Sequence, residues 1–343
     1  MKLIRFTTEH SADAKFGVVI HERALSFSAL QSGLGRSYPE LADSRAYLAH
    51  LPDSAKLAME LSAWGEDHLD DLAAEDRLAL DAVHLAEPVD VAALFDFGLT
   101  PQHLRNSAET MMKYEGNDPH TAPLLKAFAA AVLRKPEPSR TGRPEPLSYY
   151  KCNMNTIVGD GRTVPWPAYT SRLDIEPELA VVYGNDTQPV AGFCIFNDVS
   201  ARDVQALEFI GGFCLTKDMA AGNQLGPYLV TPDELADPYD VDVTVTVNGH
   251  ARFHGSTADI AHRAEDVFAW LETMAPIKSG SVMGFGTIPE CTGLDHDDFL
   301  DPGDAVEITF DGLGTLHCRL GEPTGPLLPS RWPVRASLSR YHE

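Results

Sequence analysis

Three alternating acidic residues followed at once by an apolar run constrain this chain more than any other segment. They are Asp174, Glu176 and Glu178, and the apolar run after them covers residues 179–183. In a β-strand, side chains at i, i+2 and i+4 lie on one face, so the three carboxylates are expected to point the same way. Like charges on one face repel each other, and a divalent cation bound through oxygen atoms would neutralise them. The segment therefore predicts a strand that contributes to a metal site; the alternative is an exposed edge strand blunted by Pro177.

Composition narrows the class of protein. A chain of 343 residues with 44% hydrophobic and 22% charged residues is typical of a globular protein. The net charge of −23 is spread along the chain, which argues against nucleic acid or membrane as a partner but not against a small anionic substrate. No stretch approaches the length of a membrane span, and the N-terminus has no signal-peptide pattern. Five widely spaced cysteines without a CxxC pair indicate buried thiols of a cytoplasmic protein.

The chain is expected to divide after residue 88. Short strands, with Phe16–Ile20 the clearest, and Ala- and Leu-rich helical segments up to about residue 85 predict a small N-terminal α+β domain over residues 1–88. Pro88 precedes a new apolar segment at Val91–Phe97. The remainder, residues 89–343, is expected to form one catalytic domain.

Local signals place several elements in the second part. Thr100, followed by proline, has the pattern of a helix N-cap, and the helix is expected to end near Gly116. A second helix is expected over residues 122–133, before a Pro- and Arg-rich connector at 136–146.

Strands prevail further along the chain. Residues 241–247 alternate valines with polar residues, and Asn248-Gly249 predicts a type I′ hairpin turn after them. Ser256 and Thr257 are expected to cap a helix that runs to about Met274.

A cluster of polar groups follows the predicted strand at residues 190–196. Asp198 lies where that strand ends, and Arg202 and Gln205 come shortly after it. Side chains at strand ends frequently carry function. The alternative is that Asp198 or Ser200 only caps a helix, but capping leaves Arg202 and Gln205 without a reason.

Two further residues are weak candidates on their own. Lys217 interrupts an apolar segment, although a lysine in a surface loop is the simpler interpretation. His103 lies seven residues after Asp96, in the first turn of a predicted helix. The positive end of the helix dipole would keep this histidine neutral, as a general base must be. An exposed histidine in a helix cap is the alternative.

Taken together, the motifs resemble those of the fumarylacetoacetate hydrolase superfamily. In order, they read LDIEPELAVVYG, NDVSARDVQ, TKDMAAGNQLGPYLV, VTVNGHARFHGST, MGFGTIPECTG and LDPGDAVEITFDGLGTL. The resemblance spans roughly residues 96–321, and an ordered set over so much of the chain is specific. It implies an α+β, β-rich fold in which a mixed β-sheet roll with flanking helices follows the small N-terminal domain.

The resemblance also implies a site with one divalent metal ion, Mg²⁺ in the first place and Ca²⁺ or Mn²⁺ as alternatives. The implied metal ligands are Glu176, Glu178, Asp198 and, as in the hydrolases of the family, Asp96. Asp174 would support them. The implied catalytic residues are His103, which would activate water, and Arg202, Gln205 and Lys217. The implied substrate contacts are Tyr150 and Thr287.

The implied activity is metal-dependent hydrolysis of a C–C bond in a small anionic oxo acid of the β-diketone or acylpyruvate type. Such a substrate chelates a metal through two oxygens, and the metal acts as a Lewis acid. Water activated by His103 would attack a carbonyl, and Arg202 or Lys217 would stabilise the oxyanion. The same site can run as a 2-oxo acid decarboxylase, a tautomerase or isomerase, or a dehydratase, so these stay open. The family also implies a homodimer.

Two departures from the family pattern bear on the activity. The family histidine is usually supported by a glutamate, and compact members have it three residues on, where this chain has Asn106. Glu290 and Glu109 are the candidates to replace it. The loop GTIPECTG also departs from the common Gly-Thr-Pro-x-Gly form at a place where substrate selectivity is set. A catalytically silent metal-binding homologue is the rival of a different class, whereas a sugar- or nucleotide-binding module has no supporting motif.

Overall fold

A large mixed sheet forms the centre of the molecule. The computed structural model describes residues 1–9, 11–132 and 146–342. Within these residues, ten strands follow one another across the sheet in the order β4 (Leu78–Ala79), β3 (Arg23–Ser26), β2 (Ser11–Ile20), β1 (Lys2–Thr8), β14 (Asn223–Val230), β12 (Val190–Asp198), β11 (Pro177–Tyr183), β17 (Ser281–Thr287), β6 (Ala93–Phe97) and β7 (Tyr149–Lys151). Two short strands join this path at its side: β5 (His84–Leu85) on β1 and β8 (Ile157–Val158) on β14.

A second sheet packs against the first one. It consists, in spatial order, of β16 (His250–Ser256), β15 (Asp242–Val247), β18 (Ala305–Phe310), β19 (Gly314–Leu320) and β9 (Arg162–Val164). Because successive residues of a strand face opposite sides, Leu179 and Val181 of β11 point into the core shared with the second sheet. Ala180 and Val182 point into another core on the far side of the large sheet. A strand buried on both faces reads as a continuous apolar run, as residues 179–183 do.

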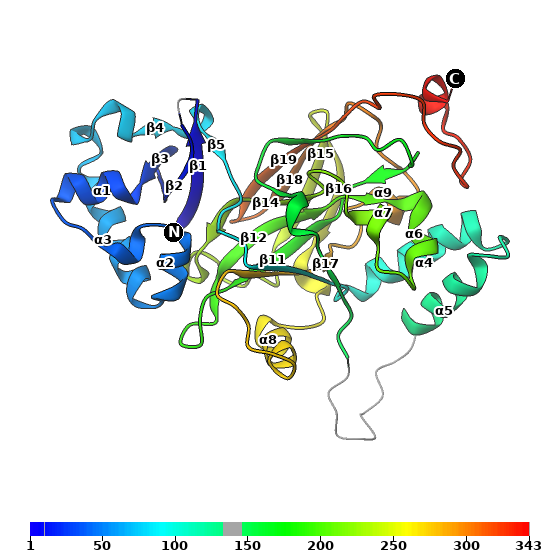
Figure 1. The fold of residues 1–343 in the computed structure, drawn as a ribbon, viewed down its shortest axis with the longest axis horizontal. Helices are drawn as coiled ribbons and strands as arrows, with labels where there is room; N and C mark the ends of the chain where they lie inside the picture. Colours follow the sequence, from blue (N-terminus) through cyan, green and yellow to red (C-terminus); the bar gives the residue numbers. More distant parts are fainter. Residues whose placement is uncertain (10, 133–145, 343) are drawn as a thin grey trace.

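The N-terminal segment continues the large sheet. Strand β1 pairs antiparallel with β14, with Lys2 opposite Val230 and Leu3 opposite Leu229. Helices α1 (Phe27–Leu34), α2 (Ser44–Ala49) and α3 (Asp53–Asp67) lie beside these strands at the blue end of the ribbon (Figure 1). One apolar core includes residues of this segment and of β11, β12 and β14. The division after residue 88 stays a prediction, and the structure adds that the sheet runs across it.

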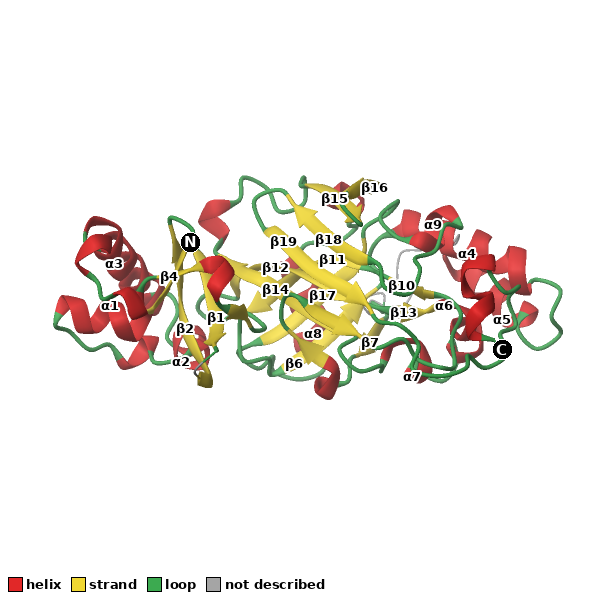
Figure 2. Ribbon diagram, turned by 90° about the horizontal axis from the view of Figure 1, so that it is seen from above, coloured by secondary structure: helices red, strands yellow, loops and turns green. Residues whose placement is uncertain are grey.

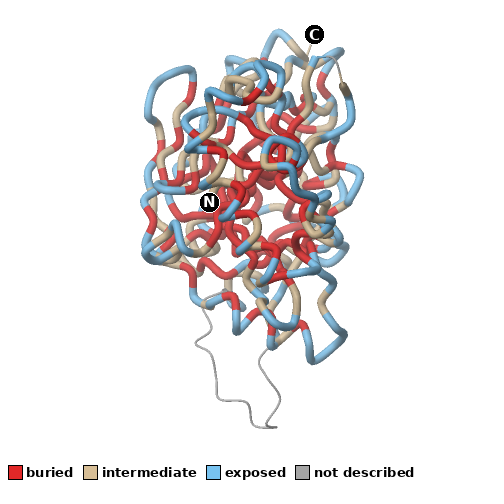
Figure 3. Tube along the Cα trace, turned by 90° about the vertical axis from the view of Figure 1, so that its left-hand side faces the viewer, coloured by how far each residue is buried: buried red, intermediate tan, exposed pale blue. Residues whose placement is uncertain are grey.

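Helices gather at the opposite end of the molecule. They are α4 (Pro101–Glu115), α5 (Ala122–Val132), α6 (Arg202–Glu208), α7 (Cys214–Lys217) and α9 (Gly293–His296). A small two-stranded sheet of β10 (Leu173–Asp174) and β13 (Ser200–Ala201) lies among them (Figure 2). Helix α8 (Ala264–Glu272) lies apart from them (Figure 1). Buried stretches of chain concentrate in the interior of the molecule, under exposed loops (Figure 3).

Short 3₁₀ turns complete the secondary structure of the described residues. They cover Pro39–Leu41, Leu69–Asp71, Ala74–Asp76, Leu80–Ala82, Met154–Thr156, Pro232–Glu234, Thr257–Asp259 and Ala336–Tyr341.

The α+β, β-rich fold is confirmed, and so are several predicted elements. Helix α4 starts at Pro101 and ends before Gly116, and α5 covers Ala122–Val132. The predicted hairpin joins β15 and β16, and its turn residues Asn248 and Gly249 have φ of 52° and 78°. Two positive φ angles are what a type I′ turn requires.

Four local predictions differ from the structure. The acidic triplet is not one strand, because β10 ends at Asp174 and β11 begins at Pro177. The edge-strand alternative is also wrong, since β11 lies between β12 and β17. Ser256 caps only a 3₁₀ turn, and the helix after it begins at Ala264. One cysteine, Cys214, is exposed, while the other four are buried. Of the predicted connector at 136–146, residues 136–145 lie outside the described residues.

Candidate active site

Carboxylates from three separate segments meet at the helical end of the large sheet. Asp96 lies on β6, Glu176 lies between β10 and β11, and Asp198 ends β12. One oxygen from each of them lies within 4.8 Å of the others. The Asp198 backbone N–H donates to the Glu176 carbonyl oxygen at 3.1 Å, which fixes two of the three relative to each other. We call Asp96, Glu176 and Asp198 the carboxylate cluster.

Glu178, the remaining predicted ligand, borders this cluster. Its Oε2 accepts a 3.0 Å hydrogen bond from the Gly286 backbone. A Cβ on Gly284 would lie 2.5 Å from the same oxygen, so a glycine is needed for the close approach of β17. Burial, and then the nearby carboxylates, raise the pKa of Glu178 well above its usual range. The structure thus places Glu178 beside the cluster, with one oxygen held by the backbone.

Two cations lie among these acids. The Lys217 ammonium donates to Glu176 Oε2 at 2.6 Å and to Asp198, and lies 3.4 Å from Asp96 Oδ2. The alternative of a lysine in a surface loop is therefore wrong, since only 5% of the Lys217 side chain is exposed. Arg202 donates to Glu176 through Nη1 and to Asp174 through Nε, the latter at 3.0 Å.

The cations do not balance the acids evenly. Burial opposes ionisation of Glu176, but Arg202 and Lys217 outweigh it and lower the pKa of this carboxyl. Burial raises the pKa of Asp198 well above its usual range, and the neighbouring carboxylates add to it, although Lys217 opposes them. Burial and mutual repulsion of the carboxylates thus act most strongly at Asp198 and Glu178, even though Lys217 contacts Asp198.

The residues present fit a divalent metal ion. Asp198 Oδ1 is buried and has no hydrogen-bond partner among the described residues. A buried acceptor without a partner is costly, and most such atoms in proteins are satisfied. The surrounding donors are carboxylate oxygens, which hard cations such as Mg²⁺, Mn²⁺ and Ca²⁺ prefer. Asp96, Glu176 and Asp198 would hold such an ion, and the open oxygen of Asp198 supports this.

A histidine–aspartate pair, His103 and Asp295, lies next to the cluster, and we call this pair the dyad. His103, the third residue of α4, has Nδ1 2.7 Å from Asp295 Oδ1 and Nε2 3.9 Å from Glu176 Oε1. Because the Asp295 carboxylate accepts the hydrogen bond from Nδ1–H, Nε2 is the ring nitrogen that faces the cluster. Ser107 Oγ lies 3.2 Å from Nε2.

Asp295 corrects the expected support of His103. Neither Glu109 nor Glu290 partners the imidazole. Glu290 instead donates its backbone N–H to Asp295 Oδ2 at 2.8 Å, and Asn106 donates to the same oxygen at 3.2 Å. Asn106, where the resemblance implied a glutamate, therefore donates to the acid that contacts His103. A weak signal was available, since Asp295 is the second residue after the divergent loop GTIPECTG.

Asp174, at the end of β10, is hydrogen-bonded both to Arg202 and to the start of the helix that carries Asp295. Its carboxylate, which is buried, accepts hydrogen bonds from Arg202, from Thr292 Oγ1 at 2.6 Å and from the backbone N–H groups of Gly293 and Leu294 at 2.9 Å. These N–H groups begin α9, the helix that carries Asp295. Asp174 thus has a supporting position, as the resemblance implied.

The remaining predicted residues, Gln205, Tyr150 and Thr287, are each bonded to or paired with a residue at or beside the site. Gln205 accepts from Arg202 Nη1 at 3.3 Å, and Arg202 Nη2 donates to Thr292 at 3.0 Å. The guanidinium is therefore bound by protein groups on all its nitrogens. Tyr150 donates to Asp218, the residue after Lys217, and Thr287 lies opposite Glu178 in the sheet. Their substrate contacts stay predictions.

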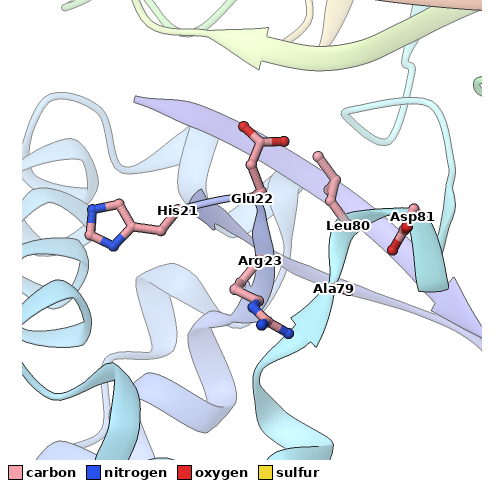
Figure 4. A pocket seen from close by; sticks show the side chains of 6 residues that line it. All are labelled: His21, Glu22, Arg23, Ala79, Leu80 and Asp81. Carbon is pink, nitrogen blue, oxygen red and sulfur yellow. The ribbon is translucent and has the colours of Figure 1, made fainter.

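A surface depression lies elsewhere, on the N-terminal segment. It has a volume of about 360 Å³ and its lining, shown in Figure 4, is His21, Glu22, Arg23, Ala79, Leu80 and Asp81. None of these residues belongs to the carboxylate cluster or to the dyad.

Among the described residues, no helix is long and apolar enough to cross a membrane.

Comparison with known proteins agrees with this picture of the fold. The chain belongs to the fumarylacetoacetate hydrolase family: the model described as "Fumarylacetoacetate (FAA) hydrolase C-terminal" matches residues 117–321. An uncharacterised protein of Staphylococcus haemolyticus is 32% identical over 173 residues, which cover 47% of this chain and 57% of that protein. One of Staphylococcus aureus is 30% identical over 183 residues, 50% of this chain and 60% of that protein. The chain thus spans little more than half the length of these curated relatives.

Solved structures share the fold over 94% of this chain. A fumarylacetoacetate hydrolase from Exiguobacterium antarcticum has a TM-score of 0.65 at 22% identity and is covered to 99%. A maleylpyruvate hydrolase from Sphingobium sp. SYK-6, in complex with manganese(II) and pyruvate, has a TM-score of 0.62 at 19% identity, and 100% of that chain is covered. A 5-carboxymethyl-2-hydroxymuconate delta-isomerase from Mycobacterium smegmatis has a TM-score of 0.59 at 20% identity, and 99% of that chain is covered. At these identities the likeness concerns the fold.

Proposed function

We propose that this protein is a metal-dependent hydrolase that cleaves a C–C bond in a small anionic oxo acid of the acylpyruvate or β-diketone type. The observation that carries the proposal is the position of His103. Its Nδ1 is bound to Asp295 and its Nε2 lies 3.9 Å from the carboxylate cluster. A general base oriented by an acid next to a set of metal-ligating oxygens is suited to activate water. Membership of a hydrolase family supports the same conclusion.

The residues of the chain have distinct parts in the reaction. When bound, Mg²⁺ or a similar ion supplies Lewis acidity toward the two oxygens of a 1,3-dicarbonyl. His103 Nε2 removes a proton from water as the water oxygen bonds to the carbonyl carbon, and Asp295 stabilises the imidazolium that forms. The C–C bond then breaks, its electron pair goes to the leaving enolate, and the imidazolium returns the proton to the leaving carbon.

The Lys217 ammonium stabilises the oxyanion that forms when water attacks the carbonyl carbon. All three guanidinium nitrogens of Arg202 already donate to protein groups, so its part is to hold Glu176 and Asp174 in place. An ammonium near the developing negative charge is an effective stabiliser in a buried site. Gln205, which accepts from Arg202, supports that arrangement.

Product analysis tests the activity. Purified full-length protein with Mg²⁺ or Mn²⁺ is incubated with acetylpyruvate and, separately, with oxaloacetate. We expect acetate and pyruvate from the first, with kcat of His103→Gln lower by roughly 10²–10⁴-fold. Release of CO₂ from oxaloacetate without cleavage of any acylpyruvate, or full activity of His103→Gln, would contradict the proposal. Light scattering of the same preparation tests the homodimer that the family implies.

A further inference from the structure

We propose that Lys217 is an internal cation that must leave the carboxylate cluster for the metal ion to bind, and that its ammonium is thereby released for the substrate. The inference rests on the proposed metal site. It concerns how the site is loaded.

The contacts of Lys217 are the starting point. Its ammonium lies against Asp96, Glu176 and Asp198, which are the members of the carboxylate cluster. An ammonium has three N–H donors, and three carboxylates are arranged around it. The side chain is 5% exposed, so water contributes little to its neutralisation.

The ammonium and a metal ion are therefore alternatives. A divalent ion binds carboxylate oxygens at about 2.0–2.6 Å. Lys217 Nζ is itself 2.6 Å from Glu176 Oε2, within the distance at which that oxygen would hold the ion. Two cations sharing the same oxygens would also repel each other strongly in a buried place. In the cluster, Asp198 Oδ1 is a buried oxygen without a hydrogen-bond partner among the described residues, and one such oxygen does not make a ligand set.

The lysine can leave without movement of the sheet. Lys217 is the last residue of α7, a helix of four residues, and its long side chain has several rotatable bonds. Once off the carboxylates, the ammonium has unpaired donors within reach of the cluster. Metal and substrate binding are then coupled, because the ion releases the group that attracts the substrate anion, and such coupling is reciprocal.

Two measurements on the full chain test this. Calorimetric titration with Mn²⁺ compares the wild type with Lys217→Met, and with Lys113→Met as a matched control whose lysine is exposed and bonded to Asp297. We expect Lys217→Met to bind Mn²⁺ about tenfold more tightly or better, and the control to bind like the wild type. Reductive methylation of the wild type, read by peptide mass spectrometry, should be at least about tenfold faster at Lys217 when Mn²⁺ is saturating, with Lys113 as internal reference.

The outcomes separate this inference from the proposed function. If Mn²⁺ binds and supports turnover while Lys217 stays protected from methylation, or while Lys217→Met binds no more tightly, the lysine inference is overturned and the function stands. If Mn²⁺ binds to neither form, both fall. The methylation needs no variant, so it decides the question even if Lys217→Met fails to fold.

Discussion

At the scale of single residues, the orientation of the His103 imidazole depends on Asp295, the acid bonded to its Nδ1. The side chain of Asp295 is buried and accepts hydrogen bonds from the imidazole, from Asn106 and from the Glu290 backbone. Three donors around one carboxylate fix the direction of its oxygens. The imidazole is thus held with Nε2 toward the cluster.

Asp295→Asn is expected to lower kcat by roughly 10²–10⁴-fold with little change in stability, since the amide favours the wrong imidazole tautomer. Steady-state kinetics with the acylpyruvate that is turned over will measure it. Asp297→Asn is the control, because Asp297 lies just after α9 but bonds to Lys113 and Tyr114 instead. Equal losses in both variants would mean that Asp295 acts only through the fold.

Single residues were predictable where a motif marked them. Asp96, His103, Glu176, Asp198 and Lys217 were all candidates, and the structure brings them together. Asp295 was not, because its partner is 192 residues away in the chain and an aspartate at the start of a short helix has no distinctive neighbour. Pairings of that kind depend on the tertiary fold.

At the scale of elements, strand β17 aligns the acids of its two neighbours. Gly284 lies opposite Ala180 on β11 and opposite Asp96 on β6. A methyl group at this position would meet Glu178 Oε2 at 2.5 Å and the Phe196 ring at 2.8 Å. The spacing of the site therefore depends on a residue without a side chain.

Gly284→Ala is expected to weaken Mn²⁺ binding by about 10–100-fold, because Glu178 must move beside the cluster. The added methyl should also cost about 1–3 kcal/mol of unfolding free energy. Calorimetric titration and chemical denaturation measure the two effects. Gly325→Ala, where nothing lies within 4 Å of the new methyl, is the control. Unchanged Mn²⁺ affinity in Gly284→Ala would show that the position of Glu178 is not critical.

The contact between β19 and the turn after β8 predicts that the stability of the fold depends on pH. A hydrogen bond from His317 on β19 to Asp160, opposed by partial burial, raises the pKa of the imidazole. A raised pKa stabilises the fold fully below the unfolded pKa of about 6.5, and the effect is lost as pH rises through the folded value. His317→Gln should therefore lose about 0.2–1 kcal/mol more at pH 5.5 than at pH 8.5. Equal losses in denaturation at both pH values would contradict this.

Elements were predictable where the signal is local. The Asn248-Gly249 turn and the proline at the start of α4 act through their own backbone angles. The break between Asp174 and Pro177 was not predictable, because alternation continues across it while β10 and β11 pair with different strands. The late start of α8 was missed since Ser256 caps a 3₁₀ turn just as well.

At the scale of the whole molecule, the N-terminal segment and the rest of the described chain share one sheet and one core. Strand β1 covers the edge of β14, and the core with Leu3 and Phe16 also contains Ala180, Cys194 and Leu225. Composition suggested a boundary near residue 88 but contained no signal for this pairing, which joins positions more than 200 residues apart. Removing the segment would leave an open strand edge and an exposed apolar face.

A chain truncated to residues 89–343 is accordingly expected to aggregate or to lose its cooperative thermal transition. Circular dichroism melting and size-exclusion chromatography against the full chain measure this. A truncated chain that melts cooperatively at the temperature of the intact protein would show that the first 88 residues form a separable domain.

The central claim is that the carboxylate cluster is a metal centre facing His103. Anomalous diffraction at the manganese edge, from crystals of the full chain grown with Mn²⁺, tests it most directly. We predict one strong peak bounded by Asp96, Glu176 and Asp198, at about 2.0–2.6 Å from Asp198 Oδ1, with room for one water between the ion and His103 Nε2. A saturated crystal with no peak there, or with its only peak at another place, would contradict the account.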